Sequence, residues 1–235
     1  MAVRGERSKR GIGGWLWLGV KFMAGLFVSI HVYALLLFFV PVPATMNMAV
    51  RTVQGYELRR DWILIEDVSP HLIRAVIAAE DTKFCAHRGV DVGAIQKALD
   101  EHRQTGRLRG ASTITQQTAK NVFLWNGGGV ARKLPEAWFA TFIDAYWGKR
   151  RVLEVYLNVA EWGDGVFGAE AAAQVRFGKP AADLTRREAA LLAAVLPSPH
   201  VWRADRPGPY VLQRTETLLA RMRDVERDGL ATCAL

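Results

Sequence analysis

The fold of this chain is decided between residues 79 and 121, where two dense polar runs stand close together: AEDTKFCAHRG at 79–89 and GASTITQQTAKN at 110–121. The first run ends an apolar helical pattern with two carboxylates, Glu80 and Asp81. The second places hydroxyls, amides and a cation within the ten residues from Ser112 to Asn121. Such polar groups are costly to bury unless they line a site. We therefore take the two runs as the centre of a functional site.

Length and composition set broad limits. The chain has 235 residues, half of them apolar, which is enough for one core and too apolar for a disordered protein. Its formal net charge of +8 suits anionic partners: nucleic acid, acidic lipid headgroups or phosphorylated substrates. Charge alone does not select among them. The sequence contains no zinc-ligand spacing, P-loop or dinucleotide-binding fingerprint.

The chain has two cysteines, Cys85 and Cys233, which are too few for a disulfide scaffold. Their separation along the chain does not forbid a bridge between them. We nevertheless expect them to be unpaired.

The N-terminal region predicts a membrane anchor. Residues 1–14 form a basic tail, and from Phe22 to Val40 the only strongly polar side chain is His31. Nineteen residues at about 1.5 Å each nearly cross a hydrocarbon core of about 30 Å. Trp15 and Trp17 stand where interfacial anchors are expected, and Pro41 ends the helix. We predict a transmembrane helix over residues 15–41.

The alternative for this region is a cleaved signal peptide. A signal peptide has an apolar region of about 7–15 residues and a small-residue cleavage site. This apolar region is longer, and Val42-Pro43-Ala44 is a poor cleavage site. We therefore predict an uncleaved anchor. Its basic flank stays in the cytoplasm, so that residues 42–235 lie outside it as one domain.

Residues 42–235 read as mostly α-helical. Ser69 and Pro70 are a hydroxyl cap and a proline at the first helical position, followed by apolar residues at helical spacing. The segment before them, 44–68, looks extended or loop-like. Helices are expected at about 70–81, 91–103, 112–123, 130–146, 150–158, 169–177, 185–196 and 210–227. Strand signals are few and short.

Glu80 is the first candidate for a general base. Its like-charged neighbour Asp81 and the nearby apolar Ile77 and Phe84 would raise its pKa. Acidic residues oppose the dipole at a helix C-terminus, so helix stability does not explain the pair. A second carboxylate, Glu136, follows at a distance, and sugar chemistry commonly uses two carboxylates. The alternative for Glu80 and Asp81 is a surface pair at a helix end.

A cationic set accompanies these carboxylates. It consists of Lys120, Arg132 and Lys133, with the amides of Gln116 and Gln117 beside Lys120. Amides and cations together suit a pyrophosphate or sugar hydroxyls. For each of these residues taken singly, a solvated surface side chain is the alternative.

Other polar residues are assigned to structural support. The run 149–158 has helical apolar spacing, and Glu154, Tyr156 and Asn158 read as buried hydrogen-bonding groups that hold the site. His87 is likewise read as a satisfied structural histidine, and Phe84 as a residue of the core.

These runs resemble the motifs of the peptidoglycan glycosyltransferase family (glycosyltransferase family 51). The first motif is matched by Glu80-Asp81-x-x-Phe84-x-x-His87-x-Gly89, and the second by residues 110–121. The third is matched by Arg132-Lys133-x-x-Glu136, the fourth by residues 149–158, and the fifth by residues 189–199. Five motifs in the family's order over about residues 60–200 make a specific match. With a predicted anchor and no room for a transpeptidase domain, the chain is similar to the family's monofunctional biosynthetic branch.

The resemblance implies a lysozyme-like, mostly α fold and a reaction mechanism. Glu80 would deprotonate the 4-hydroxyl of the acceptor, which attacks the anomeric carbon of the donor and inverts it. Glu136 would act on the phosphate side of the cleft, directly or through a divalent ion. Substrate-binding roles would fall to Asp81, Ser112, Thr113, Gln116, Gln117, Lys120, Asn121, Arg132 and Lys133.

The resemblance also implies partners and a location. The substrates would be lipid II and a lipid-linked glycan strand at the outer face of the inner membrane, with undecaprenyl pyrophosphate as the leaving group. Cell-division or elongation proteins would be the protein partners, and nucleic acid would not be a partner. The resemblance implies no cofactor with certainty and leaves the metal requirement open, because Mg²⁺ or Mn²⁺ could assist Glu136. The catalytic domain would be periplasmic.

Two other functions compete with this one. A membrane-bound lytic transglycosylase or muramidase also uses a catalytic glutamate on a lysozyme-like fold, but it has little need of the three cations. A non-catalytic cell-wall scaffold would not need Glu80, Glu136 and Lys120 intact.

One loop departs from the family pattern. Many members carry an arginine between the second and third motifs, near position 128, where this chain has the run Asn126-Gly127-Gly128-Gly129. Three glycines give mobility but no cation. We therefore expect Lys120, Arg132 and Lys133 to supply most of the phosphate contact, and an arginine at position 128 to tighten it.

Overall fold

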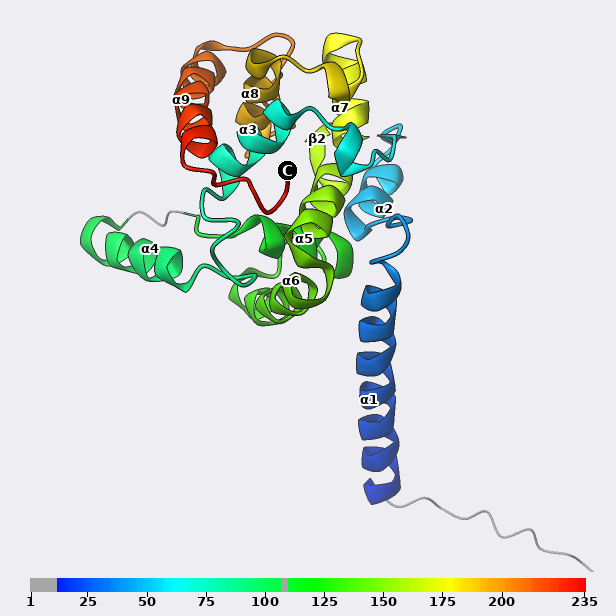
Figure 1. Ribbon diagram of the computed structural model, residues 1–235. Coiled ribbons are helices and arrows are strands. Elements are labelled where there is room, and N and C mark those ends of the chain that lie inside the picture. Colours follow the sequence, from blue (N-terminus) through cyan, green and yellow to red (C-terminus); the bar gives the residue numbers. More distant parts are fainter. Residues whose placement is uncertain (1–11, 107–109) are drawn as a thin grey trace, which may run out of the picture. The chain divides into compact units, whose positions relative to one another are not determined.

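The computed structural model describes residues 12–106 and 110–235 (Figure 1). The chain divides after Val40 into two units, Met1–Val40 and Pro41–Leu235. The basic residues at positions 4–10 lie outside the described residues.

The first unit contains α1, Ile12–Leu36, which is apolar around its whole circumference. The stretch Gly13–Leu36 is long and apolar enough to cross a membrane, judged by length and composition. Its large apolar side chains, such as Trp15 and Phe22, are exposed, as expected of a helix made for lipid. The helix ends at Leu36 rather than at the predicted residue 41, because turns precede the prolines Pro41 and Pro43.

The second unit is mostly α-helical, as predicted. Its helices are α2 (Met46–Val53), α3 (Pro70–Glu80), α4 (Val92–Thr105), α5 (Ile114–Phe123), α6 (Gly129–Val159), α7 (Ala169–Phe177), α8 (Arg186–Val195) and α9 (Pro209–Arg227). Two 3₁₀ turns, η1 (Ile65–Asp67) and η2 (Ala181–Asp183), separate some of them.

A small sheet supplements the helices. Its strands β1 (Arg59–Arg60), β2 (Glu161–Gly163) and β3 (Val166–Phe167) lie in the order β1-β3-β2. β1 runs parallel to β3, with Arg59 opposite Val166, and β2 runs antiparallel to β3. The sheet therefore joins the segment after α2 to the turn after α6.

The helices differ from the prediction in three places, each for a local reason. The segment 44–68 is not wholly extended, because Thr45 caps α2 by accepting a hydrogen bond from Met48 N at 3.3 Å. α5 begins after Thr113 rather than at Ser112, and Thr113 forms a capping box with Gln116. The two helices expected at 130–146 and 150–158 are joined as α6, with a kink where Gly148 has φ of 69°.

Two sets of helices form the core. α3, α8 and α9 pack against one another, and α5 packs along α6. Leu72 and Val76 of α3, Leu192 of α8, and Leu218 and Met222 of α9 are buried in the first set. This packing fixes the C-terminal end of α3, where Glu80 stands.

The two cysteines are paired, contrary to the prediction. Cys85, in the turn after α3, forms a disulfide with Cys233, in the turns after α9. Their 148-residue separation gave no indication of this, because the fold brings the two segments together. The bridge ties the C-terminal segment to the loop that follows Glu80 and Asp81.

Candidate active site

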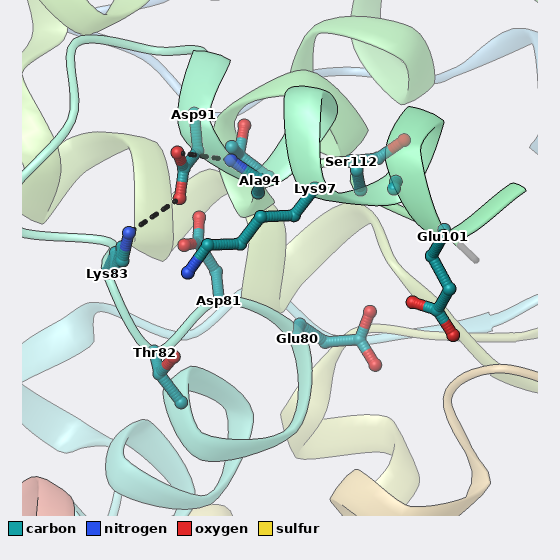
Figure 2. Close-up of a pocket in the computed structure, with 13 residues that line it drawn as sticks. Glu80, Asp81, Thr82, Lys83, Asp91, Ala94, Lys97, Glu101 and Ser112 are labelled. Atoms are coloured by element: carbon teal, nitrogen blue, oxygen red, sulfur yellow. Dashed lines mark hydrogen bonds and ion pairs between the residues drawn. The ribbon is translucent and has the colours of Figure 1, made fainter. Parts of the chain in front are cut away.

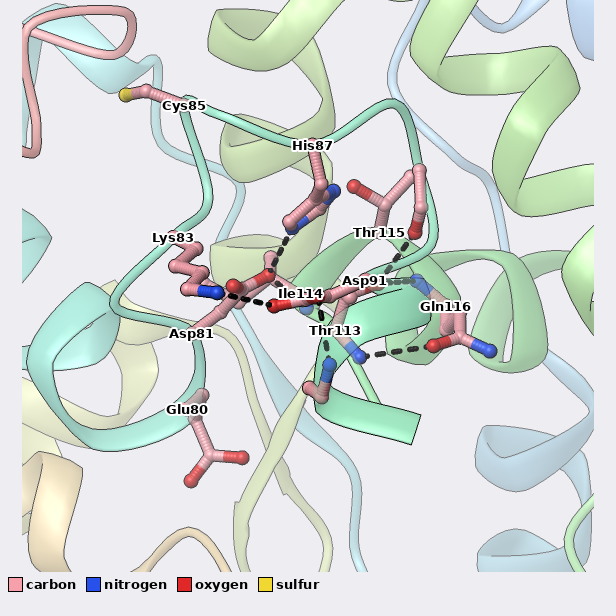
Figure 3. Close-up of polar contacts among 12 residues, drawn as sticks. Glu80, Asp81, Lys83, Cys85, His87, Asp91, Thr113, Ile114, Thr115 and Gln116 are labelled. Atoms are coloured by element: carbon pink, nitrogen blue, oxygen red, sulfur yellow. Dashed lines mark hydrogen bonds and ion pairs between the residues drawn. The ribbon is translucent and has the colours of Figure 1, made fainter. Parts of the chain in front are cut away.

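Glu80 and Asp81 stand next to each other in the sequence, but their side chains diverge (Figure 3). Glu80 is the last residue of α3, and Asp81 is its C-cap, with φ of −163°. The change of backbone direction buries the carboxylate of Asp81. That carboxylate lies 2.8 Å from His87 Nε2 and accepts a hydrogen bond from Ile114 N at 3.0 Å. Asp81 is thus held in a buried network and also lines the cavity beside Glu80, and its role in substrate binding stays a prediction.

Glu80 keeps its carboxylate at the cleft and accepts a hydrogen bond from Gln117 Nε2 at 2.9 Å. Burial is the main cause that raises the pKa of Glu80, and the charge of Asp81 adds to it. The Gln117 hydrogen bond and the positive charges of Arg214 and Lys120 lower the pKa and offset part of the effect. A carboxylate with a raised pKa is suited to accept a proton. Arg214, on α9, was not among the predicted site residues.

The loop after Asp81 is fixed to the neighbouring helices. Thr113 Oγ1 donates to Gly89 O at 2.6 Å, and Lys149 Nζ lies 4.8 Å from the ring centre of the buried Phe84. Gly89 has φ of +81°, and a Cβ there would come within 2.6 Å of Ala140 O. Only glycine allows α6 to approach this closely. Phe84 is buried and His87 contacts Asp81, and their supporting roles stay predictions.

Gln117 links Glu80 to a buried tyrosine. Its Oε1 accepts from Tyr156 Oη at 3.4 Å, so its Nε2 is free to face Glu80. Burial raises the pKa of Tyr156 well above its ordinary value, so the phenol remains a donor at neutral pH. Gln116 instead points into the capping box of α5, where its Oε1 accepts from Thr113 N at 3.1 Å. Of the two adjacent glutamines, Gln117 is therefore the one that contacts Glu80.

The cleft beside Glu80 has a volume of about 250 Å³ (Figure 2). Residues from the loop after α3, from α4 and from the segment before α5 line it. They include Lys83, Asp91, Lys97, Glu101, Ser112 and Thr113. Lys97 and Glu101 of α4 were not predicted from the sequence, because charged residues on a helix resemble solvated surface charges. Figure 2 shows the Lys97 side chain extending toward Asp81 and Lys83.

A cationic cluster, defined as Lys120, Arg132 and Lys133, surrounds Glu136. The Glu136 side chain is 2% exposed; Arg132 Nη1 donates to its Oε2, and Lys133 Nζ donates to its Oε1 at 2.6 Å. Lys133 Nζ also donates to Ser112 Oγ at 2.9 Å, which joins the cluster to the cleft. Burial, with the charges of Arg132 and Lys133, lowers the pKa of Lys120.

Lys120 faces a second cavity of about 140 Å³. Gln117, Asn121 and Tyr156 line it, together with Asn47 of α2, Asn126 and Glu161 of β2. The last three were not predicted as site residues, because they come from three distant segments. The hydrogen bond from Gln117 to Glu80 connects this cavity with the cleft.

The glycine run is folded into a defined turn. Gly127, Gly128 and Gly129 have φ of 93°, 80° and 53°. A Cβ at Gly128 would lie 3.2 Å from both Arg132 Cβ and Trp125 Nε1, in a backbone conformation that side chains rarely adopt. An arginine at position 128 would therefore strain this turn, so that substitution is not a clean test of added charge.

The three residues at the end of α6 that were predicted to support the site, Glu154, Tyr156 and Asn158, are buried. Asn158 accepts from Ile63 N and donates to Ile63 O, both at 2.8 Å, and Glu154 accepts from Ile65 N at 3.2 Å. Glu154 also pairs with Arg151. These buried bonds hold the segment that leads into α3.

The arrangement does not match a divalent-ion site. Both oxygens of Glu136 accept from cations, and no group of three or more His, Cys, Asp or Glu gathers within residues 12–106 and 110–235. The geometry instead provides a carboxylate with a raised pKa, a cluster of cations and two polar cavities linked by the hydrogen bond from Gln117 to Glu80.

Comparisons with known proteins give a consistent result. The family model described as Transglycosylase matches residues 46–223. The chain is 51% identical over 214 residues to a biosynthetic peptidoglycan transglycosylase of Rhodospirillum centenum, covering 91% of this chain and 93% of the relative. It is 48% identical to the protein of that name from Caulobacter vibrioides, covering 93% of both chains. For the protein of that name from Pseudomonas entomophila, the values are 52% identity, 80% of this chain and 82% of the relative.

Proposed function

This chain belongs to the transglycosylase family and is a peptidoglycan glycosyltransferase of cell-wall biosynthesis, and from this premise we propose that it polymerises lipid II. The product is a β-1,4 glycan strand, and undecaprenyl pyrophosphate is released. The observation that carries the proposal is the pairing of a raised-pKa carboxylate, Glu80, with the cationic cluster around Glu136.

The chemistry follows from these positions. Glu80 takes the proton of the acceptor's 4-hydroxyl as the oxygen attacks the anomeric carbon of the donor. The bond from that carbon to the pyrophosphate oxygen breaks, and its electron pair leaves with the pyrophosphate. The cationic cluster stabilises this charge. Attack on the face opposite the leaving group converts an α-linked donor into a β linkage.

Glu136 holds the cluster in place in this scheme. Its carboxylate accepts from Arg132 and Lys133, so two cations that would repel each other stay on one side of the site. Ser112 extends the contact toward the cleft through Lys133. In this proposal Glu136 acts by orienting Arg132 and Lys133 toward the phosphates.

We further propose that α1 anchors the protein in the inner membrane with residues 42–235 in the periplasm. α1 has the length and apolar surface that such a span needs. The basic residues before it favour a cytoplasmic N-terminus. The disulfide between Cys85 and Cys233 supports an oxidising compartment for the second unit. Assembly with cell-division or elongation proteins stays a prediction.

Labelled lipid II given to the purified full-length protein tests the proposal. We expect long glycan strands, and none from the Glu80→Gln variant. Shortening of preformed glycan without polymerisation would favour the lytic enzyme, and neither activity would favour the scaffold. The cationic cluster favours polymerisation, because a lytic reaction has no pyrophosphate to stabilise.

A further inference from the structure

Glu161 of β2 contacts α2 and holds it against the rest of the second unit. Its side chain is 7% exposed. It forms an ion pair with Arg51, whose Nε lies 2.8 Å from Oε1, and it accepts hydrogen bonds from Asn47 Nδ2 at 2.8 Å and from Gly165 N at 3.3 Å. Two of these partners, Asn47 and Arg51, stand on one face of α2, four residues apart. α2 therefore meets the rest of the second unit through a largely buried carboxylate.

This carboxylate decides how the side-chain amide of Asn47 is turned. An ionised carboxylate only accepts hydrogen bonds, so Asn47 must present its NH₂ group to Glu161. Its Oδ1 then faces the other way and accepts from Asn126 Nδ2 at 2.8 Å. The orientation of Asn126 is thereby fixed in turn, because its NH₂ group must face Asn47.

Asn126 begins the glycine turn, and the turn is held from its other side as well. Arg132 Nε donates to Gly127 O at 2.6 Å, while Arg132 Nη1 pairs with Glu136. Asn47 and Asn126 both line the cavity that Lys120 faces. The turn is thus held between α2 and the cationic cluster.

We propose that Asn47 is a positioning residue that keeps the glycine turn in place over the cavity for the phosphates of the donor. The relay runs from Glu161 through Asn47 to Asn126. The glycine turn has no cation to bind the phosphates, since Gly127–Gly129 carry no side-chain charge. The relay instead contributes to binding by holding the backbone of the turn in position. The proposal rests on the proposed function for the identity of the ligand as a polyprenyl pyrophosphate.

The test is the affinity of the full-length protein in detergent for undecaprenyl pyrophosphate. Asn47→Asp faces Glu161 with a second carboxylate, and we expect it to weaken binding about tenfold, or about 1.4 kcal/mol. Glu161→Gln in the parent should also weaken binding, because its amide group opposes a donor on Asn47 or Arg51. The double variant Asn47→Asp with Glu161→Gln should recover most of the affinity, since the amide introduced at position 161 would then donate to the new carboxylate.

Two further variants separate the relay from general damage. Gln54→Glu adds the same charge to the end of α2, where the side chain accepts from Arg51 Nη1 at 2.9 Å, and should leave affinity unchanged. Asn126→Ala removes the exposed end of the relay without touching Glu161, and should lose as much affinity as Asn47→Asp. Combining Asn126→Ala with Asn47→Asp should cost no more than either change alone.

Parent-like affinity in Asn126→Ala, or no recovery in the double variant, would overturn the relay. Polymerisation of lipid II by the parent protein is measured separately. If the parent binds the pyrophosphate but makes no polymer, the proposed function fails while the relay stands. If the parent makes polymer and all the variants bind equally, the relay fails and the proposed function stands.

Discussion

Glu80 and Glu136 are the two carboxylates predicted to act in one reaction, and the structure gives them opposite surroundings. Glu80 ends α3 beside the neutral amide of Gln117, and burial raises its pKa. Glu136 lies near the start of α6, where Arg132 and Lys133 each donate to one of its oxygens. In the proposed mechanism, the same type of side chain takes a proton in one place and holds two cations in the other.

The difference teaches that neighbours, rather than residue type, assign the two roles. Around Glu80, the cations Lys120 and Arg214 offset burial only in part. Around Glu136, a cation is in direct contact with each carboxylate oxygen. The following predictions test this division of roles.

The largest expected effect is the loss of activity in Glu80→Gln. The change keeps the size of the side chain and one accepting oxygen but removes the proton acceptor, so we expect a loss of about 10²–10⁴ in polymerisation rate. Rates on labelled lipid II measure it. Glu216→Gln, which changes a surface glutamate paired with Arg187, is the matched control and should keep the parent rate. A Glu80→Gln enzyme within a few-fold of the parent would remove Glu80 from the chemistry.

Glu136→Gln should be the next most damaging change, for a different reason. Breaking a buried ion pair leaves charges uncompensated and typically costs about 3–5 kcal/mol of stability. Misplaced cations would also slow the reaction, by up to about 10²-fold. Thermal unfolding and polymerisation rates should fall together in this variant, whereas Glu80→Gln should lose rate alone. A stable but inactive Glu136→Gln protein would instead place Glu136 in direct chemistry.

Lys120→Ala should have a smaller effect on activity. A charge-assisted contact is worth about 1.5–3 kcal/mol, which corresponds to a loss of about 10–150-fold in the rate. Because Arg132 and Lys133 are committed to Glu136, they cannot move to replace Lys120. Lys120→Arg, which keeps the charge, is the comparison and should retain more activity. Equal rates in the two variants would show that volume, rather than charge, matters at this position.

The sequence predicted the surroundings of Glu80 better than those of Glu136. The helical spacing before Glu80, the apolar neighbours and the adjacent Asp81 were enough to expect a raised pKa. The divergence of Glu80 and Asp81 could not be foreseen, because it depends on the backbone of the C-cap and on the hydrogen bond that Asp81 accepts from Ile114 N. Likewise, a motif identified the run from Arg132 to Glu136. The ion pairs within that run became visible only in the structure, where α6 brings these side chains together.

Contacts between distant segments were missed most often. No local sequence pattern marks Asn47 and Glu161, because their hydrogen bond joins residues 114 positions apart in the chain. Cys85 and Cys233 were expected to be unpaired, since sequence separation gives no information on distance in the fold. The start of α5 was predicted with an error of only one residue, because the hydroxyls of Ser112 and Thr113 both suit an N-cap. Thr113 is the cap because it forms the capping box with Gln116, three residues later.

The smallest expected effect is a gain in stability from Glu80→Gln at neutral pH. Burial raises the pKa of Glu80 in the folded protein above its unfolded value of about 4.3, so the folded state binds this proton more tightly. The stability contributed by Glu80 is therefore complete below the unfolded pKa and is lost as the pH rises through the folded pKa. Glutamine does not titrate and avoids that loss. We expect a gain of roughly 0.5–2 kcal/mol at pH 7, the usual range for a stabilising substitution.

The same gain should disappear at about pH 3–4, below the unfolded pKa, because Glu80 is then protonated in both states. Thermal unfolding of the full-length protein in detergent at both pH values measures the difference, and Glu216→Gln should show none. Glu136→Gln should shift stability in the opposite direction at pH 7, since its carboxylate is compensated by two cations and that of Glu80 is not. If Glu80→Gln were instead less stable than the parent at pH 7, Glu80 would be a residue that holds the fold, and the contrast between the two carboxylates would not stand.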